Sequence, residues 1–159
     1  MSIGSEAVFK LPHHLYYEEK MDTENRADAT NTSGTGTILL IDDEPEVLRV
    51  MAIRLERMGH RVVSTTDSRE ALQMIRKDPE EYDLVLTDQA MPQISGDQLA
   101  QKIIALRPDM PLILCTGFSY SIDEHEARRM GFEALLAKPI LGADLTAVVS
   151  RCLLQRPVH

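Results

Sequence analysis

The sequence has few cysteines, no excess of positive charge and no long apolar segment. Its two cysteines, Cys115 and Cys152, are too few for a disulfide framework or a metal site, so a reducing, cytoplasmic setting is the simplest interpretation. A formal net charge of −8 argues against a nucleic-acid surface, which normally carries a basic patch. No apolar run approaches the roughly 20 residues of a membrane-spanning helix. We therefore expect neither nucleic-acid binding nor membrane contact by this segment.

The N-terminal part of the chain differs from the rest. It lacks a basic region followed by an apolar core, so we expect no secretory signal peptide. Residues 20–36 are polar, rich in Asn, Asp, Thr, Ser and Gly, and without hydrophobic periodicity. Residues 7–12 could form a short strand, although no partner strand is evident. We predict a flexible tail or linker over residues 1–36 and one folded domain over residues 37–156.

Within the predicted domain, apolar strands alternate with amphipathic helices five times. The predicted strands span residues 37–41, 61–65, 84–87, 111–115 and 133–137. The predicted helices run from Pro45 to Gly59, from a Ser68 cap to Asp78, from a Ser95 cap to Arg107, from a capping box at 121–124 to Gly131, and from Asp144 beyond Arg151. This alternation predicts an α/β fold with one parallel sheet and helices on both faces.

The predicted strand order depends on the apolar content of the strands. The second strand is the least apolar of the five, so we place it at an edge and predict the order 2-1-3-4-5. The order then reverses between the first and third strands, where Asp42, Asp43 and Asp88 should emerge side by side. Ligands of open α/β sheets bind at this kind of switch point.

Three carboxylates in one crevice indicate a cation site. Without a cation they would repel one another, and Mg²⁺ is the hard divalent cation that proteins hold with one or two carboxylates, waters and phosphate oxygens. Each residue also has a simpler interpretation, because Asp42 and Asp43 could cap a helix and Asp88 could form a turn. Thr116 and Lys138 end the fourth and fifth predicted strands at the same edge.

A carboxylate nucleophile, Mg²⁺, a hydroxyl and an ammonium together make a phosphoryl-transfer site that would form an acyl phosphate on Asp88. We expect Lys138 to pair with Asp88.

These residues also carry a family resemblance. The sequence contains, in order, Ile41-Asp42-Asp43-Glu44, Thr87-Asp88 with Met91-Pro92 and Gly96, Thr116-Gly117, and Lys138-Pro139. The set resembles a two-component response-regulator receiver domain, which has the flavodoxin-like fold, over roughly residues 37–156.

The resemblance implies a role for each residue of the site. Asp88 would accept a phosphoryl group from a histidine. The metal ligands would be Asp43 directly, Asp42 through water, Asp88, and the backbone carbonyl of Ala90.

Of the remaining matched residues, Thr116 would hydrogen-bond the phosphoryl group and Lys138 would pair with one of its oxygens. Pro139 would follow a cis peptide bond.

Two positions depart from the family pattern. Leu135 stands three residues before Lys138, where such domains often carry the Phe or Tyr of a Thr–aromatic switch. Phe118 or Tyr120 could substitute for that ring. Ala90 has no polar side chain to interact with an attacking water, so the lifetime of the aspartyl phosphate is not predicted.

The resemblance implies a phosphorelay receiver, not a multiple-turnover enzyme. Its partner would be a histidine kinase or a histidine phosphotransfer protein, and the domain would be a monomer or weak dimer. Residues 4–12 look like the closing strand of a kinase ATP-binding domain, so we favour the C-terminal receiver of a hybrid sensor histidine kinase over a free-standing regulator. Residues 156–159 leave no room for a DNA-binding output domain.

Two other classes remain as alternatives. An aspartate-nucleophile phosphohydrolase of the haloacid-dehalogenase type also uses Asp, Thr and Lys around Mg²⁺. Its nucleophile lies in an Asp-x-Asp motif after the first strand, whereas this chain has adjacent aspartates there. The third possibility is a binding-only module with the receiver fold.

Overall fold

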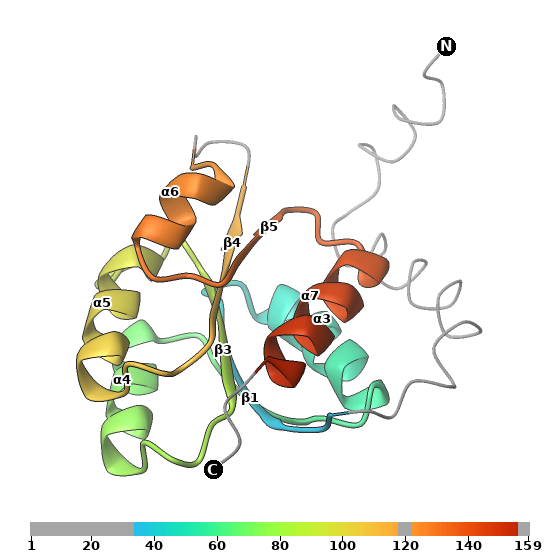
Figure 1. Cartoon of the computed structure of the whole chain (residues 1–159), viewed down its shortest axis with the longest axis horizontal. Helices are drawn as coiled ribbons and strands as arrows, with labels where there is room; N and C mark the ends of the chain where they lie inside the picture. The colour runs from blue at the N-terminus through green and yellow to red at the C-terminus, as the bar shows by residue number, and fades with distance from the viewer. Residues whose placement is uncertain (1–33, 118–121, 156–159) are drawn as a thin grey trace.

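The chain folds as alternating strands and helices around one sheet (Figure 1). The computed structural model describes residues 34–117 and 122–155. Within these ranges the strands are β1 (Thr37–Ile41), β2 (Arg61–Thr65), β3 (Leu84–Asp88), β4 (Leu112–Thr116) and β5 (Ala134–Ala137). The helices are α3 (Pro45–Arg57), α4 (Ser68–Lys77), α5 (Gly96–Leu106), α6 (Glu124–Arg129) and α7 (Gly142–Leu154).

The sheet is parallel and has the order β2-β1-β3-β4-β5, as the sequence predicts. β2 lies at one edge, and only its last residue, Thr65, is buried. β1 pairs with β3 up to Ile41 opposite Thr87, and β3 pairs with β4 up to Asp88 opposite Cys115. The residues that follow these strands therefore emerge at one edge of the sheet.

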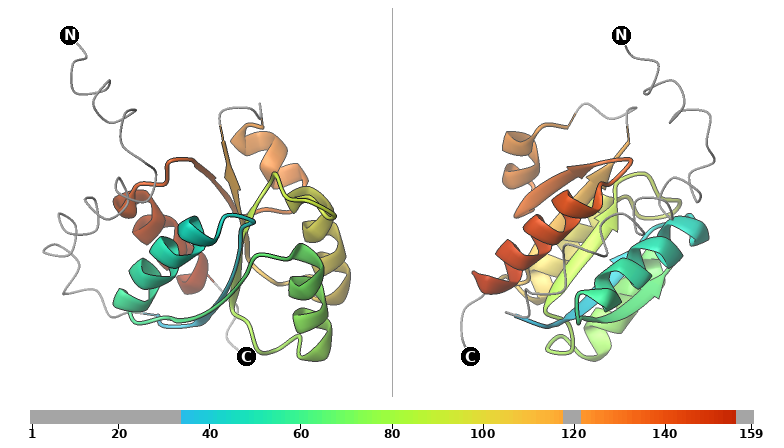
Figure 2. Two further views of the ribbon diagram at one scale, coloured as in Figure 1. Left: turned by 180° about the vertical axis from the view of Figure 1, so that it is seen from behind. Right: turned by 90° about the vertical axis from the view of Figure 1, so that its right-hand side faces the viewer.

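Helices cover both faces of the sheet and bury two apolar layers (Figure 2). α3 and α7 pack on the face of Ile38 and Leu40, and α4, α5 and α6 pack on the face of Leu39 and Ile41. Successive residues of a strand point to opposite faces, so a strand buried on both faces is apolar at every position. Burial of each such side chain contributes about 1.5–3 kcal/mol.

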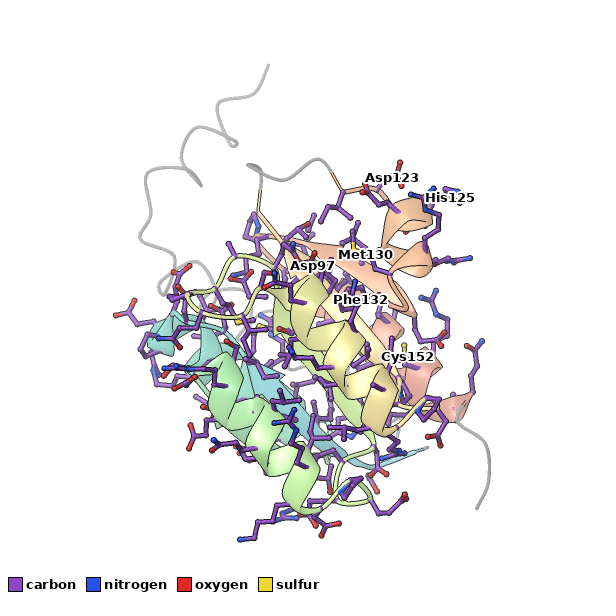
Figure 3. The ribbon with its side chains drawn as sticks, turned by 90° about the vertical axis from the view of Figure 1, so that its left-hand side faces the viewer. Asp97, Asp123, His125, Met130, Phe132 and Cys152 are labelled. Carbon is purple, nitrogen blue, oxygen red and sulfur yellow. The ribbon has the colours of Figure 1, made fainter. Side chains whose placement is uncertain are left out.

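A glycine sets the contact between α6 and α5. Gly131 has a φ of 101°, which favours glycine, and a Cβ there would lie 2.2 Å from Cδ1 of Ile104. Phe132 is buried in the same apolar layer, and Met130 packs against that layer (Figure 3). A side chain at residue 131 would strain the backbone and would require the end of the Ile104 side chain in α5 to move.

Three predicted helix starts are wrong by one or two residues. Asp67, not Ser68, caps α4: its Oδ1 accepts a hydrogen bond from Arg69 N–H at 2.8 Å, while the Ser68 hydroxyl donates to the carbonyl of Pro92. α6 begins after Asp123, whose carboxylate accepts from Glu126 N–H at 2.8 Å, two residues later than the predicted cap. α7 begins at Gly142, two residues before the predicted start. Several residues that can cap a helix lie close together in sequence before α4 and before α6. Tertiary packing decides which of them caps the helix.

The other sequence expectations for the fold have mixed outcomes. β3 and β5 differ from their predicted ranges by one residue at one end, and β4 is shifted by one residue at both ends. The Lys138–Pro139 peptide bond is cis, as the resemblance implies. The strand predicted at residues 7–12 lies outside the described residues. None of the described helices is both long and apolar enough to cross a bilayer.

His60 ties the beginning of β2 to the residues before β1. Its ring is buried, and Nδ1 accepts a hydrogen bond from the Gly36 N–H at 3.2 Å. The next residue, Arg61, donates its N–H to the Gly36 carbonyl at 3.0 Å. Burial lowers the pKa of His60 below its ordinary value of 6.5. A protonated Nδ1 could not accept the Gly36 hydrogen bond, so the folded chain favours the neutral ring.

We predict that acid destabilises the domain through His60. The unfolded chain binds a proton at this residue more readily than the folded chain, so stability contributed by the neutral ring is present above the unfolded pKa and is lost as pH falls through it. Urea unfolding at about pH 7.5 and about pH 5 brackets the ordinary histidine pKa. Lowering the pH should cost the wild type more unfolding free energy than it costs His60→Gln. His125→Gln, the same change at an exposed histidine of α6 (Figure 3), is the matched control. Identical pH dependence of the wild type and His60→Gln would contradict the prediction.

Candidate functional site

Three carboxylates meet beyond the carboxyl ends of β1 and β3. Asp42 and Asp43 follow β1, and Asp88 is the last residue of β3. Each offers an oxygen atom within 4.8 Å of the others. Asp42 and Asp88 are buried, whereas Asp43 is exposed. The strand order thus brings together the three acidic side chains that the sequence singles out.

Lys138 bridges two of these carboxylates. Its Nζ lies 2.7 Å from Oδ2 of Asp42 and 3.2 Å from Oδ1 of Asp88. The sequence led us to expect a pair with Asp88 alone, but the ammonium is shared and its shorter contact is with Asp42. Burial acts to lower the pKa of Lys138, yet the two carboxylates outweigh it and raise the pKa above its ordinary value. The lysine is therefore a permanent cation of the site.

The surroundings of the two buried carboxyl groups, Asp42 and Asp88, disfavour their charged forms. Burial, and after it the negative charge of Asp42, raise the pKa of Asp88, while Lys138 lowers it; together they bring the pKa to about 6. The pKa of Asp42 is also raised, chiefly by burial, despite its contact with Lys138. Oδ1 of Asp42 accepts a hydrogen bond from the Glu44 N–H at 2.9 Å, which fixes the orientation of the carboxylate. One ammonium does not balance three carboxylates.

This charge imbalance fits a divalent cation. Carboxylate oxygens within 4.8 Å of one another are the ligand type that Mg²⁺ prefers, and a second cation would relieve the repulsion that raises the pKa of Asp88. Ala90, whose carbonyl we predict as a further ligand, lies in the exposed loop two residues beyond Asp88.

Thr116 completes the edge of the site. It is the last residue of β4, it is buried, and its carbonyl accepts the Lys138 N–H at 2.8 Å. Among the described residues, no heavy atom outside its chain neighbours lies within 4 Å of a Cβ built at Gly117. Leu135 is half-buried and packs against the layer under α5 and α6. The aromatic residues proposed in its place, Phe118 and Tyr120, lie outside the described residues.

Sequence reasoning missed one residue of this region. Gln89 directly follows Asp88, is 8% exposed, and forms hydrogen bonds with the first turn of α5. A lone glutamine at the end of a strand carries no sequence signal, because its partner Asp97 is identified only by the fold of the intervening loop.

A doubly wound parallel sheet that gathers three carboxylates, a threonine and a lysine at its switch point defines a phosphoryl-accepting signalling domain. The comparisons with known proteins name the family. The profile of the response regulator receiver domain matches residues 38–150, and the chain belongs to that family.

Curated relatives include regulators and a kinase. Transcriptional regulatory protein GlrR of Escherichia coli (strain K12) is 33% identical over 103 residues, which cover 65% of this chain and 23% of that protein. Sensor histidine kinase RcsC of Salmonella typhimurium is 27% identical over 143 residues, covering 84% of this chain and 15% of the kinase. The chain thus spans less than a quarter of the length of either relative.

Solved structures confirm the fold. A response regulator receiver domain protein from Clostridium thermocellum superposes with a TM-score of 0.71 at 29% identity, covering 75% of this chain and 94% of that one. A CheY-like receiver domain protein from Methanospirillum hungatei has a TM-score of 0.69 at 28% identity, covering 76% of this chain and 94% of that one. The predicted receiver fold is therefore confirmed.

We predict that Asp42→Asn lowers the pKa of Asp88. The substitution removes the charge that repels the Asp88 carboxylate and frees Lys138 to pair with Asp88 alone, and both effects favour ionised Asp88. A titration of carboxyl carbons by NMR, without divalent cations, should show the pKa falling from about 6 toward the ordinary 3.8. Asp78→Asn, at the end of α4 and near the amino end of β3, is the control. An unchanged or higher pKa for Asp88 in Asp42→Asn would refute the proposed repulsion.

Proposed function

We propose that Asp88 is the residue on which this receiver domain accepts a phosphoryl group, from a phosphohistidine on a histidine kinase or a histidine phosphotransfer protein. The observation that carries the proposal is the bridge of Lys138 between Asp42 and Asp88 at the switch point of the sheet. It places a nucleophile, an acidic cluster and a cation around one position. The domain that performs this function would span residues 37–156.

In the proposed transfer, an oxygen of Asp88 attacks phosphorus while the bond between phosphorus and the histidine nitrogen breaks. The electron pair of that bond returns to the imidazole, and the product is an acyl phosphate on Asp88. A pKa of about 6 leaves Asp88 mostly ionised at neutral pH, as a nucleophile must be.

The other site residues would act on the oxygens of the phosphoryl group. Mg²⁺, when bound by Asp42, Asp43, Asp88 and the carbonyl of Ala90, supplies positive charge to those oxygens. Lys138 would keep its 2.7 Å contact with Asp42 and exchange its longer contact with Asp88 for a phosphoryl oxygen. The Thr116 hydroxyl would donate a hydrogen bond to another phosphoryl oxygen. Because Leu135 has no ring to follow the movement of Thr116, the signal to a partner would not use a Thr–aromatic pair formed with residue 135.

We also propose that the chain is the C-terminal receiver of a hybrid sensor histidine kinase. The match to RcsC supports this, because it covers 84% of the chain and is wider than the family match at residues 38–150. The resemblance of residues 4–12 to a closing kinase strand points the same way. The kinase domains would lie upstream of Met1 in the full reading frame. Two free, buried cysteines agree with a cytoplasmic location.

The same proposal treats the domain as a single-turnover acceptor. A haloacid-dehalogenase-type phosphohydrolase would need an Asp-x-Asp motif, and β1 is followed by the adjacent pair Asp42-Asp43. The presence of Asp42, Asp43, Asp88, Thr116 and Lys138 together argues against a binding-only module.

The experiment is incubation with Mg²⁺ and either acetyl phosphate or beryllofluoride. We expect one phosphoryl group per chain, or one beryllofluoride adduct by ¹⁹F NMR, which Asp88→Asn abolishes and removal of Mg²⁺ with EDTA prevents. Asp78→Asn, a carboxylate at the far end of α4, should react like the wild type. Multiple turnover of a small phosphate ester would instead identify a hydrolase. The absence of any adduct would identify a binding-only module and overturn the proposal.

A further inference from the structure

The loop that follows Asp88 is fixed at both ends by one residue, Gln89. The Gln89 N–H donates to the carbonyl of Cys115 at 3.0 Å, which continues the pairing of β3 with β4. The Gln89 carbonyl accepts the N–H of Gly96, the first residue of α5, at 3.0 Å. The backbone of Gln89 therefore connects the sheet directly to the start of α5.

The side chain of Gln89 makes the same connection a second time. Its Nε2 donates to Oδ1 of Asp97 at 3.0 Å, and its Oε1 accepts the N–H of Asp97 at 3.0 Å. We call these two hydrogen bonds the Gln89–Asp97 clamp. Figure 3 places Asp97 in the first turn of α5. A side-chain amide that donates and accepts toward one residue has little freedom left.

Two neighbouring residues hold the clamp in place. The Ser95 hydroxyl donates to the same Oδ1 of Asp97 at 2.5 Å, and this hydrogen bond and the one from Gln89 lower the pKa of Asp97. A Cβ at Gly96 would lie 2.5 Å from the carbonyl oxygen of Asp88 and 3.0 Å from Oε1 of Gln89. The start of α5 therefore rests directly on the end of β3, with no space for a side chain between them.

The residues between the two ends of the clamp include Ala90, the predicted carbonyl ligand of Mg²⁺. Gln93, in the same loop, has a φ of 74°, a conformation that side chains rarely adopt and that surrounding structure must maintain. The Thr87 hydroxyl also donates to the carbonyl of Asp88 at 3.0 Å, but this hydrogen bond lies on the strand side of the loop, whereas the clamp connects the loop to α5.

We propose that Gln89 is a positioning residue of the phosphoryl-acceptor site: the Gln89–Asp97 clamp holds the loop so that the Ala90 carbonyl and the Asp88 carboxylate face Asp42 and Asp43. The inference rests on the proposed function. In this proposal Gln89 would contact neither the metal nor the phosphoryl group. It would set the Mg²⁺ affinity of the residues that bind the metal, by holding them in position.

The test compares Mg²⁺ affinity in three variants of the full chain. Gln89→Met keeps the length of the side chain and removes both hydrogen bonds of the clamp, and Asp97→Ala removes the carboxylate from the other side. By analogy with other residues that support metal ligands, Gln89→Met should weaken Mg²⁺ binding about 10-fold. The dissociation constant is measured from backbone amide chemical shifts during Mg²⁺ titration. In the double variant the two losses should sum to less than full additivity, because both single variants remove the hydrogen bond from Gln89 Nε2 to Asp97 Oδ1, while the bond from the Asp97 N–H to Gln89 Oε1 is lost only with Gln89.

Gln101→Met, the same change at an exposed glutamine of α5, is the matched control and should bind Mg²⁺ like the wild type. Urea unfolding of each variant separates stability from positioning. Reduced stability of Gln89→Met with unchanged Mg²⁺ affinity would overturn the inference, as would additive losses in the double variant. Absence of Mg²⁺ binding in the wild type would instead overturn the proposed function.

Discussion

The electrostatics of the site are governed by the repulsion between carboxylates that the fold places next to one another. β1 and β3 are neighbours, so Asp42 and Asp88 must emerge side by side, and burial deprives both of the water that would screen their charges. Lys138 offsets part of this cost by contacting both residues. The site retains excess negative charge, which supports the proposed binding of a divalent cation.

The architecture was predictable because each strand carries its own burial pattern. Four apolar strands and one weaker strand determine the sheet order, and the sheet order determines which carboxylates become neighbours. The contact between Lys138 and Asp42 spans 96 residues of sequence and joins the ends of β5 and β1, which are not neighbours, so the strand order predicts only that Lys138 lies at the same edge of the sheet as the carboxylates. The preference of Lys138 for Asp42 over Asp88 does not follow, since it depends on the conformation of the lysine side chain in the folded site.

The errors arose where local signals compete. Asp67 and Ser68 are both good cap residues, and the structure uses Asp67 because the Ser68 hydroxyl is occupied by the Pro92 carbonyl from a distant loop. The same limit hid Gln89, whose function depends on a partner eight residues away and across a turn. Sequence patterns report burial and local capping, whereas side-chain hydrogen bonds between elements require the folded backbone.

The order of the strands also has a consequence for folding. The proposed site takes Asp42 from the first strand of the domain, Asp88 from the third and Lys138 from the fifth, so its contacts close only when distant parts of the chain have paired. Contacts of such wide sequence separation form late, because loop closure must precede them. A chain still emerging from the ribosome, or one cut anywhere between β1 and β5, would hold no complete acceptor. Only a completely folded domain, with β1, β3 and β5 all in place, would then be able to accept the phosphoryl group.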